Sequence, residues 1–126
     1  MSVQGRDFIL AARQCFDLKN EIGYRNSISR SYYALYHETC NMLSHCPPTT
    51  HEGVVSYLLE DARRKKESYE LTSLIQLGAV LRQQKIKRKK ADYNLNDSII
   101  ESEAIGTIEL VCKMINKIDE MKSKAA

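Results

Sequence analysis

The sequence predicts an all-α protein, an antiparallel bundle of four to five helices. Apolar residues recur at three- and four-residue steps along almost the whole chain, which is the spacing of amphipathic helices. Glycine and proline are scarce, with five and two copies in 126 residues, so few positions favour a break. The length is that of one ordinary domain, and no internal repeat or low-complexity segment divides it. We therefore expect residues 1–126 to form a single domain.

Turn-forming residues separate the helical stretches. Gly23 is expected to mark the break after the first helix, and Pro47-Pro48 should stop the second, because proline does not continue a helix. Thr49 or Thr50 is placed to cap the third helix, and residues 91–97 form a polar linker before the last. The expected helices cover about residues 4–18, 26–45, a stretch that carries 54–59, 67–87 and 101–122.

Composition limits the classes of protein to which the chain can belong. No run approaches the ~20 apolar residues of a membrane span. The N-terminus lacks a basic stretch followed by an apolar one, so we expect no signal peptide and a cytoplasmic protein. The four cysteines show no CxxC spacing, and we interpret them as free buried thiols. They are Cys15, Cys40, Cys46 and Cys112.

Basic residues are concentrated although the net charge is only +3. One run is Arg63 to Lys66, and a denser one extends from Arg82 to Lys90 with no acidic residue between those two positions. Such runs attract phosphate backbones through counterion release, and the alternative is a solvated helix face. The residues that we expect to contact the phosphate backbone of a nucleic acid such as RNA are Lys85, Lys87, Arg88, Lys89 and Lys90.

The stretch Arg30-Ser-Tyr-Tyr-Ala-Leu-Tyr-His37 is the most informative one for function. At roughly 100° per residue, Arg30 and His37 leave the second helix on nearly the same face. They are also about 10 Å apart along the axis, at ~1.5 Å per residue. A cation and an imidazole displayed together suggest chemistry on phosphate. The separation suggests that two copies of the helix are needed.

The second helix has two distinct faces. Ile28, Tyr32 and Leu35 begin an apolar side that we expect to face the core. Arg30, His37 and Asn41 share the other side, which has few lysines or glutamates. The small residues on its flanks, Ser27 and Ala34, and the aromatic Tyr33 suggest an interface. We expect a two-fold symmetric homodimer through this face, which would bring Arg30 of one chain opposite His37 of the other.

These residues resemble the R-x(4–6)-H signature of the HEPN superfamily, in particular its small stand-alone prokaryotic members. The segment His51-Glu-Gly-Val-Val-Ser56 resembles the His-x-Gly element of the family, and Arg88-Lys-Lys-Ala-Asp-Tyr93 resembles its Arg-x-x-Ala-Asp-Tyr element. The resemblance covers nearly the whole chain. It implies a bundle that dimerises through the motif helix and acts as a metal-independent ribonuclease. Many members are toxins or phage-defence effectors, often with a nucleotidyltransferase-type antitoxin.

The resemblance implies roles for particular side chains. Arg30 and His37 are the expected catalytic residues, with Arg30 on the phosphate and His37 as acid or base. Ser31, Tyr33 and Asn41 are expected to support them. The family also contains non-catalytic members that bind nucleotides or protein partners, and this function remains an alternative. A plain helical adaptor for acidic partners is a third.

Two positions depart from the pattern of the family. Toxins that are silenced by nucleotidyl transfer carry a tyrosine two places after the histidine, where this chain has Thr39. Ser31 stands where active members often have Asn, Asp or His. The residues His45, Cys46 and His51 lie close in sequence but fit no standard zinc spacing, so we expect no metal and no cofactor.

Overall fold

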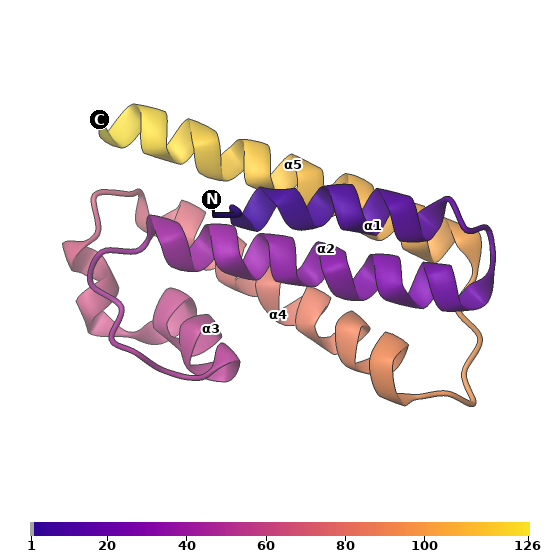
Figure 1. The fold of residues 1–126 in the computed structure, drawn as a ribbon. Helices are drawn as coiled ribbons and strands as arrows, with labels where there is room; N and C mark the ends of the chain where they lie inside the picture. Colours follow the sequence, from indigo (N-terminus) through magenta and orange to yellow (C-terminus); the bar gives the residue numbers. More distant parts are fainter. Residues whose placement is uncertain (1) are drawn as a thin grey trace.

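A computed structural model describes residues 2–126, which consist of helices and the turns between them. The elements in chain order are η1 (Gly5–Asp7), α1 (Phe8–Phe16), α2 (Glu21–Met42), α3 (His51–Glu60), η2 (Ala62–Lys66), α4 (Leu71–Tyr93) and α5 (Glu101–Ala125), η being a 3-10 helix. Helices α1, α2, α4 and α5 alternate in direction, and the short α3 packs on α4 (Figure 1). The predicted all-α bundle is confirmed. No helix in the described range is long and apolar enough to cross a bilayer.

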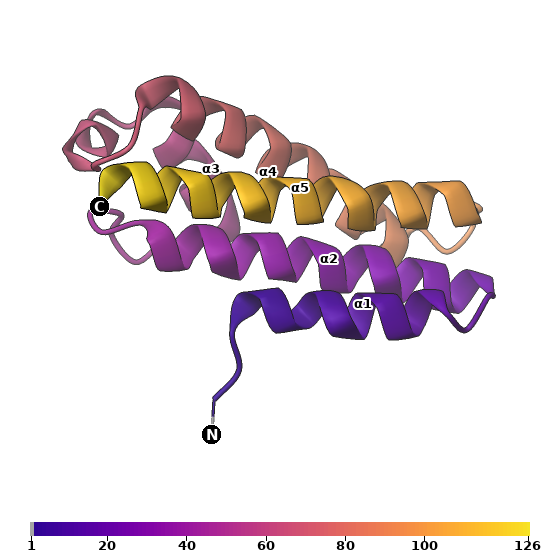
Figure 2. The same ribbon diagram turned by 90° about the horizontal axis from the view of Figure 1, so that it is seen from above.

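Helix α2 is central because it packs against α1, α4 and α5. Its predicted core face is confirmed: Tyr32 and Leu35 are fully buried and Ile28 is almost so. The α1 helix lies along another side of α2, and the chain before η1 projects away from the bundle (Figure 2). Helix α2 is therefore covered by other helices on most of its sides, and one strip of it remains accessible to solvent.

The interpretation of Ser27 and Ala34 as an outward interface is wrong. Both residues are fully buried, and Ala34 belongs to the main hydrophobic core. The neighbours that their small side chains allow to approach belong to the same chain, because both residues are buried within it. The accessible strip of α2 is therefore narrower than the helical wheel suggests. It carries Arg30, His37 and Asn41, with Tyr33 partly exposed beside them.

Helix α2 begins five residues earlier than expected, because Asn20 caps it. The Asn20 side chain accepts a hydrogen bond of 2.8 Å from the backbone N–H of Gly23. Gly23 therefore lies inside the first turn of α2 and does not mark a break. A β-carbon at this position would collide with the carbonyl oxygen of Cys15, so the glycine allows α1 and α2 to approach closely. The actual break lies before Asn20, where Lys19 has a φ of 56°.

Helix α2 ends at Met42, before the prolines. The carboxylate of Glu67, a buried residue, accepts the backbone N–H groups of Ser44 and His45 at 2.9 and 2.8 Å. It also accepts the hydroxyl of Tyr57 at 2.6 Å. These contacts draw the chain away from a helical path before Pro47 is reached. The expected cap of the third helix is confirmed at Thr50, whose hydroxyl accepts the N–H of Gly53.

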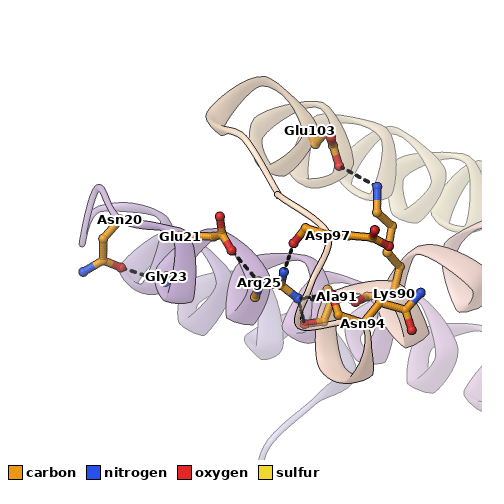
Figure 3. Close-up of polar contacts among 9 residues, drawn as sticks. All are labelled: Asn20, Glu21, Gly23, Arg25, Lys90, Ala91, Asn94, Asp97 and Glu103. Carbon is orange, nitrogen blue, oxygen red and sulfur yellow. Dashed lines mark hydrogen bonds and ion pairs between the residues drawn. The ribbon is translucent and has the colours of Figure 1, made fainter.

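Helix α4 continues through the first part of the predicted linker, to Tyr93, because Arg25 caps its end. Arg25 is 5% exposed and its guanidinium donates to the carbonyl oxygens of Ala91 at 2.9 Å and Asn94 at 3.2 Å (Figure 3). It also donates to the carbonyl of Asp97 and pairs with Glu21 at 3.2 Å. One buried cation thus satisfies several carbonyls at the C-terminal end of a helix, where the dipole is negative.

We expect Arg25→Ala to lower the free energy of unfolding by about 3 kcal/mol, because charged hydrogen bonds are lost and buried carbonyls remain unpaired. Arg25→Lys should recover only part of this loss, since an ammonium group cannot reach all of the carbonyls. Urea unfolding followed by circular dichroism measures the effect. The exposed Arg13 provides the control, and Arg13→Ala should change stability by less than about 0.5 kcal/mol. Equal stabilities of the Arg25→Ala and Arg13→Ala proteins would contradict the capping role.

We expect Ala34→Glu to unfold the chain or to destabilise it by about 3 kcal/mol or more, because it places an unpaired charge in the core. The matched change on the exposed strip of the same helix is Asn41→Glu, which should cost less than about 0.5 kcal/mol. Thermal unfolding of the two proteins at one concentration provides the comparison. A folded Ala34→Glu monomer would show that Ala34 lies on the surface.

Candidate functional site

Arg30 and His37 lie on the accessible strip of α2 and contact the same two aromatic rings, and we refer to this strip with its rings as the groove. The guanidinium carbon of Arg30 is 5.8 Å from the ring centre of Phe8 and 5.1 Å from that of Tyr33. The imidazole of His37 is 5.2 Å from the Phe8 ring and 6.2 Å from the Tyr33 ring. No hydrogen bond joins Arg30 to His37 in the described chain. The rings of Phe8 and Tyr33 therefore contact both the cation and the titratable group, and we call this pair of rings the aromatic floor.

Arg30 has no carboxylate partner among residues 2–126. Its guanidinium is half-buried and makes one long contact, 3.4 Å, to the hydroxyl of Ser29. A positive charge in this position keeps its donors free for an anion. His37 is exposed, and this side chain reaches solvent directly. The groove thus presents an available cation and an available imidazole.

The N-terminal turn holds one edge of this groove. A β-carbon on Gly5 would come within 2.7 Å of the β-carbon of His37, so only glycine permits this approach. Next to it, Arg6 donates to Glu38 at 2.9 Å and to Asp119 at 2.8 Å, which ties η1 to both α2 and α5. The same guanidinium lowers the pKa of Asp119 through a hydrogen bond.

A cavity of about 460 Å³ opens beside His37, where the N-terminal turn meets α2. His37 and Asn41 line it on the α2 side, and Gln4 and Phe8 line it on the other. Asn41 is exposed and lies one turn beyond His37, as predicted from the wheel. The opening has both polar and aromatic walls, which suits a group such as a nucleoside.

Two further groups converge on the Tyr33 ring from α3 and α4. The guanidinium carbon of Arg88 is 5.7 Å from its centre, and the ring centre of His51 is 5.9 Å away. Tyr33 is therefore surrounded by two guanidinium groups and two imidazoles from four separate positions in the sequence. The spacing of residues did not place His51 and Arg88 at this site. Tyr93 from the same Arg-x-x-Ala-Asp-Tyr element is instead 72% exposed.

His51 is held firmly by two tyrosines of α2. Its Nδ1 atom lies 2.7 Å from the hydroxyl of Tyr32, and its ring stacks on Tyr36 with centres 3.8 Å apart. Burial and the positive charge of Arg88 lower the pKa of His51, with smaller effects of Lys85 and His37. Burial raises the pKa of Tyr36 to about 12 and that of Tyr32 well above its ordinary range. Both phenols therefore stay protonated at neutral pH.

Other predicted site residues lie elsewhere. Ser31 is fully buried and its hydroxyl has no partner, so it does not reach a ligand in the groove. Lys85 is paired with Glu52 at 2.7 Å, and its side chain is only 13% exposed. Lys90 lies 3.9 Å from Glu103. Lys87 and Lys89 are exposed, and the structure gives neither an ion-pair partner in residues 2–126. The segment from Arg82 to Lys90 has no acidic residue of its own, but the fold brings Glu52 and Glu103 next to it.

Sequence reasoning missed three aromatic residues of the site. Phe8 packs against the main core and also lies beside Arg30 and His37. Tyr32 and Tyr36 pack in or against the same core and also position His51. The density of aromatic side chains around the Arg30–His37 motif was the one available signal, since three tyrosines lie between the two residues.

The described residues contain no group of three or more His, Cys, Asp or Glu side chains arranged to hold a metal ion. All four cysteines are free, and they are partly rather than fully buried. Comparison with models of known families, with curated proteins and with solved structures finds no match. The HEPN resemblance is therefore carried by the residues of this chain alone.

The lowered pKa of His51 predicts the pH dependence of stability. The unfolded chain binds the proton near the ordinary pKa of 6.5, whereas the folded chain resists it until a lower pH. Folding stability should therefore fall as pH drops through and below this value. Urea unfolding at about pH 7.5 and about pH 5.5 should show a smaller loss in His51→Gln than in the wild type. His45→Gln, in an exposed loop, should behave as the wild type does.

Proposed function

We propose that this protein is a metal-independent endoribonuclease of the HEPN type. The observation that supports it most is the pairing of an available Arg30 guanidinium with an accessible His37 imidazole on one aromatic floor. The reaction would cleave RNA to 2′,3′-cyclic phosphate and 5′-hydroxyl ends. In the cell, we propose a cytoplasmic toxin or a phage-defence effector.

The chemistry requires only groups that the chain itself supplies. The 2′-hydroxyl attacks the neighbouring phosphorus atom, its proton passes to a base, and the bond from phosphorus to the 5′-oxygen breaks. An imidazole exchanges protons near neutral pH and suits transfer to or from these oxygens. Arg30 stabilises the charge that develops on the non-bridging oxygens. Asn41, next to His37 on the cavity wall, is placed to orient the ribose.

The proposed assembly is a homodimer in which a second copy of α2 faces the groove. The accessible strip of α2 supports it, because Arg30, Tyr33, His37 and Asn41 are exposed or partly exposed along more than two turns of helix. In this arrangement Arg30 of one chain works with His37 of its partner. The burial of Ala34 moves the contact from the small residues to this polar strip.

The proposed cellular partner is a nucleotidyltransferase-type antitoxin that acts by binding. Thr39 occupies the position of the tyrosine that such enzymes modify in related toxins, and Thr39 is fully buried. Its hydroxyl has no access to a nucleotidyl donor in the folded chain. Control by a tight complex over the groove is therefore favoured over covalent modification at this position.

The alternative function is a non-catalytic HEPN module that binds a nucleotide or a protein partner through the same groove. The burial of Ser31 favours it, since the residue after the arginine adds no polar group to the site. Aromatic rings beside unpaired arginines also suit a nucleobase with its phosphate. Nucleotide titration without cleavage of any RNA would support this alternative.

We expect His37→Ala and Arg30→Ala each to reduce RNA cleavage by about 10²–10⁴-fold. Neither change opens a core cavity, so each should alter stability by less than about 1 kcal/mol. Gel analysis of a labelled single-stranded RNA measures the rate, and the ends are identified by their resistance to a 5′-exonuclease and a 3′-ligase. His45→Ala is the matched control and should cleave normally. Wild-type cleavage by His37→Ala would end the ribonuclease proposal.

Mixing the two inactive proteins tests the dimer. One cleft of the mixed dimer combines the intact Arg30 of one chain with the intact His37 of the other. Partial activity should return after subunit exchange, up to about a quarter of the wild-type level by random pairing. A mixture that remains inactive, although exchange is shown by labelled subunits, would mean that Arg30 and His37 act within one chain or that both clusters are needed at once.

A further inference from the structure

Arg88 is a partly buried cation whose charge is incompletely neutralised. Its side chain is 11% exposed, and the guanidinium lies over the rings of Tyr32 and Tyr33. Among the described residues, Asp92 is the one acid that pairs with it, at 3.5 Å, and this carboxylate also accepts the hydroxyl of Ser29 at 3.2 Å. The Nε atom of Arg88 is buried and has no hydrogen-bond partner in residues 2–126. A buried guanidinium with unused donors is costly unless an anion completes its contacts.

His51 lies next to this cation with its tautomer fixed by the fold. The hydroxyl of Tyr32 is in a fully buried residue and has one hydrogen-bond partner in the described chain, the Nδ1 atom of His51. Because the phenol proton has no other acceptor among the described residues, the arrangement that satisfies both groups is donation from the phenol to Nδ1. In this arrangement the hydrogen of the neutral imidazole lies on Nε2. Stacking on Tyr36, with planes only 14° apart, holds the ring in this orientation.

The Nε2–H of His51 is free to bind a ligand. Nε2 has no partner in residues 2–126 and is not among the buried polar atoms. Burial and the nearby charges of Arg88, Lys85 and His37 keep the ring neutral at pH 7 by lowering its pKa. Glu52 on the same helix is engaged by Lys85 and does not offset these charges. His51 is also the first residue of α3, where the helix dipole favours an anion.

The geometry points to a phosphate-binding subsite on the α3–α4 side of Tyr33, formed by the guanidinium of Arg88 and the Nε2–H of His51. In this subsite His51 acts as a neutral hydrogen-bond donor and not as an acid or a base. The subsite is separate from the Arg30–His37 pair, which lies on the α1 side of the same ring. Its assignment as a site for an RNA backbone phosphate rests on the proposed function.

The fixed tautomer distinguishes this role from general base catalysis. A base would need a lone pair on Nε2, and the Tyr32 hydroxyl would then have to donate its proton elsewhere. No other acceptor for it is present among the described residues. A glutamine at position 51 can place an uncharged N–H donor near the position of Nε2, but it cannot accept a proton. The donor role predicts that binding is lost in His51→Ala and kept in His51→Gln, whereas a base role predicts that both variants bind normally.

The test is the binding of a single-stranded oligodeoxynucleotide, which has no 2′-hydroxyl and cannot be cleaved. Fluorescence anisotropy against salt gives the affinity and its dependence on ionic strength. Arg88→Gln should reduce the log–log salt slope by about 0.7, the value for one lost phosphate contact on a single strand. His51→Ala should weaken binding by about tenfold or more, as for a lost hydrogen bond to a charged group. His51→Gln should remain within about threefold of the wild type, well short of that loss.

The matched controls each replace an arginine or a histidine that lies outside the subsite. Arg13→Gln takes one exposed arginine from α1, outside both basic runs, and His45→Gln changes an exposed histidine, so both should retain the wild-type slope and affinity. Circular dichroism confirms that each variant is folded. An unchanged slope in Arg88→Gln, or equal losses in His51→Gln and His51→Ala, would overturn the subsite. If the variants show the expected losses of binding but the wild-type protein cleaves no RNA, the proposed ribonuclease is overturned and the subsite still stands.

The tautomer can also be read directly in the wild-type protein. Nitrogen-15 chemical shifts of the imidazole at pH 7 should show a protonated Nε2 and an unprotonated Nδ1 for His51. Tyr32→Phe removes the donor and should abolish this preference while the helical bundle remains. A protonated Nδ1 in the wild type would reverse the assignment, because it would leave the lone pair of a base on Nε2.

Discussion

The capping of α4 by the guanidinium of Arg25 is the interaction on which the geometry of the site depends. Arg25 stands on α2 and binds the last carbonyls of α4, so the two helices are fixed to each other near one end. Arg88 lies on α4 close to this contact, and Tyr33 lies two turns further along α2. The Arg25 cap therefore helps to hold the Arg88 guanidinium over the Tyr33 ring, although it involves neither residue.

Four cationic residues of the molecule fall into two groups that differ in their contribution to folding stability. Arg6 and Lys85 have well-formed carboxylate partners and stabilise the arrangement of η1 and α3. Arg30 and Arg88 have weak partners or none, although both are partly or largely buried. Cations of the second kind contribute little to folding. The phosphate-binding role that we propose would account for their presence around one aromatic ring, and a bound phosphate would then stabilise the fold by mass action.

The sequence predicted those parts of the structure that depend on local periodicity. The bundle, the core face of α2 and the shared face of Arg30 and His37 follow from helical spacing, and the Thr50 cap follows from side-chain chemistry. The burial of Ala34 could not be predicted in this way. A helical wheel separates the faces of one helix, but it does not show which faces are covered by other helices. The stacking of His51 on Tyr36 and the pairing of Lys85 with Glu52 join residues distant in the sequence. Such contacts depend on packing, which spacing within one element does not encode.

Helix α2 keeps its buried and its exposed residues on separate sides, and Tyr32 and Tyr36 serve both the core and the placement of His51. Tyr32 fills the core and also orients His51. Arg30, His37 and Asn41, in contrast, can be exchanged without disturbing the buried sides of the helix. New ligand preferences are therefore open to selection at these three positions at little cost in folding. A change at Tyr32 alters the core and the groove together, which makes it the position where drift in specificity is most constrained.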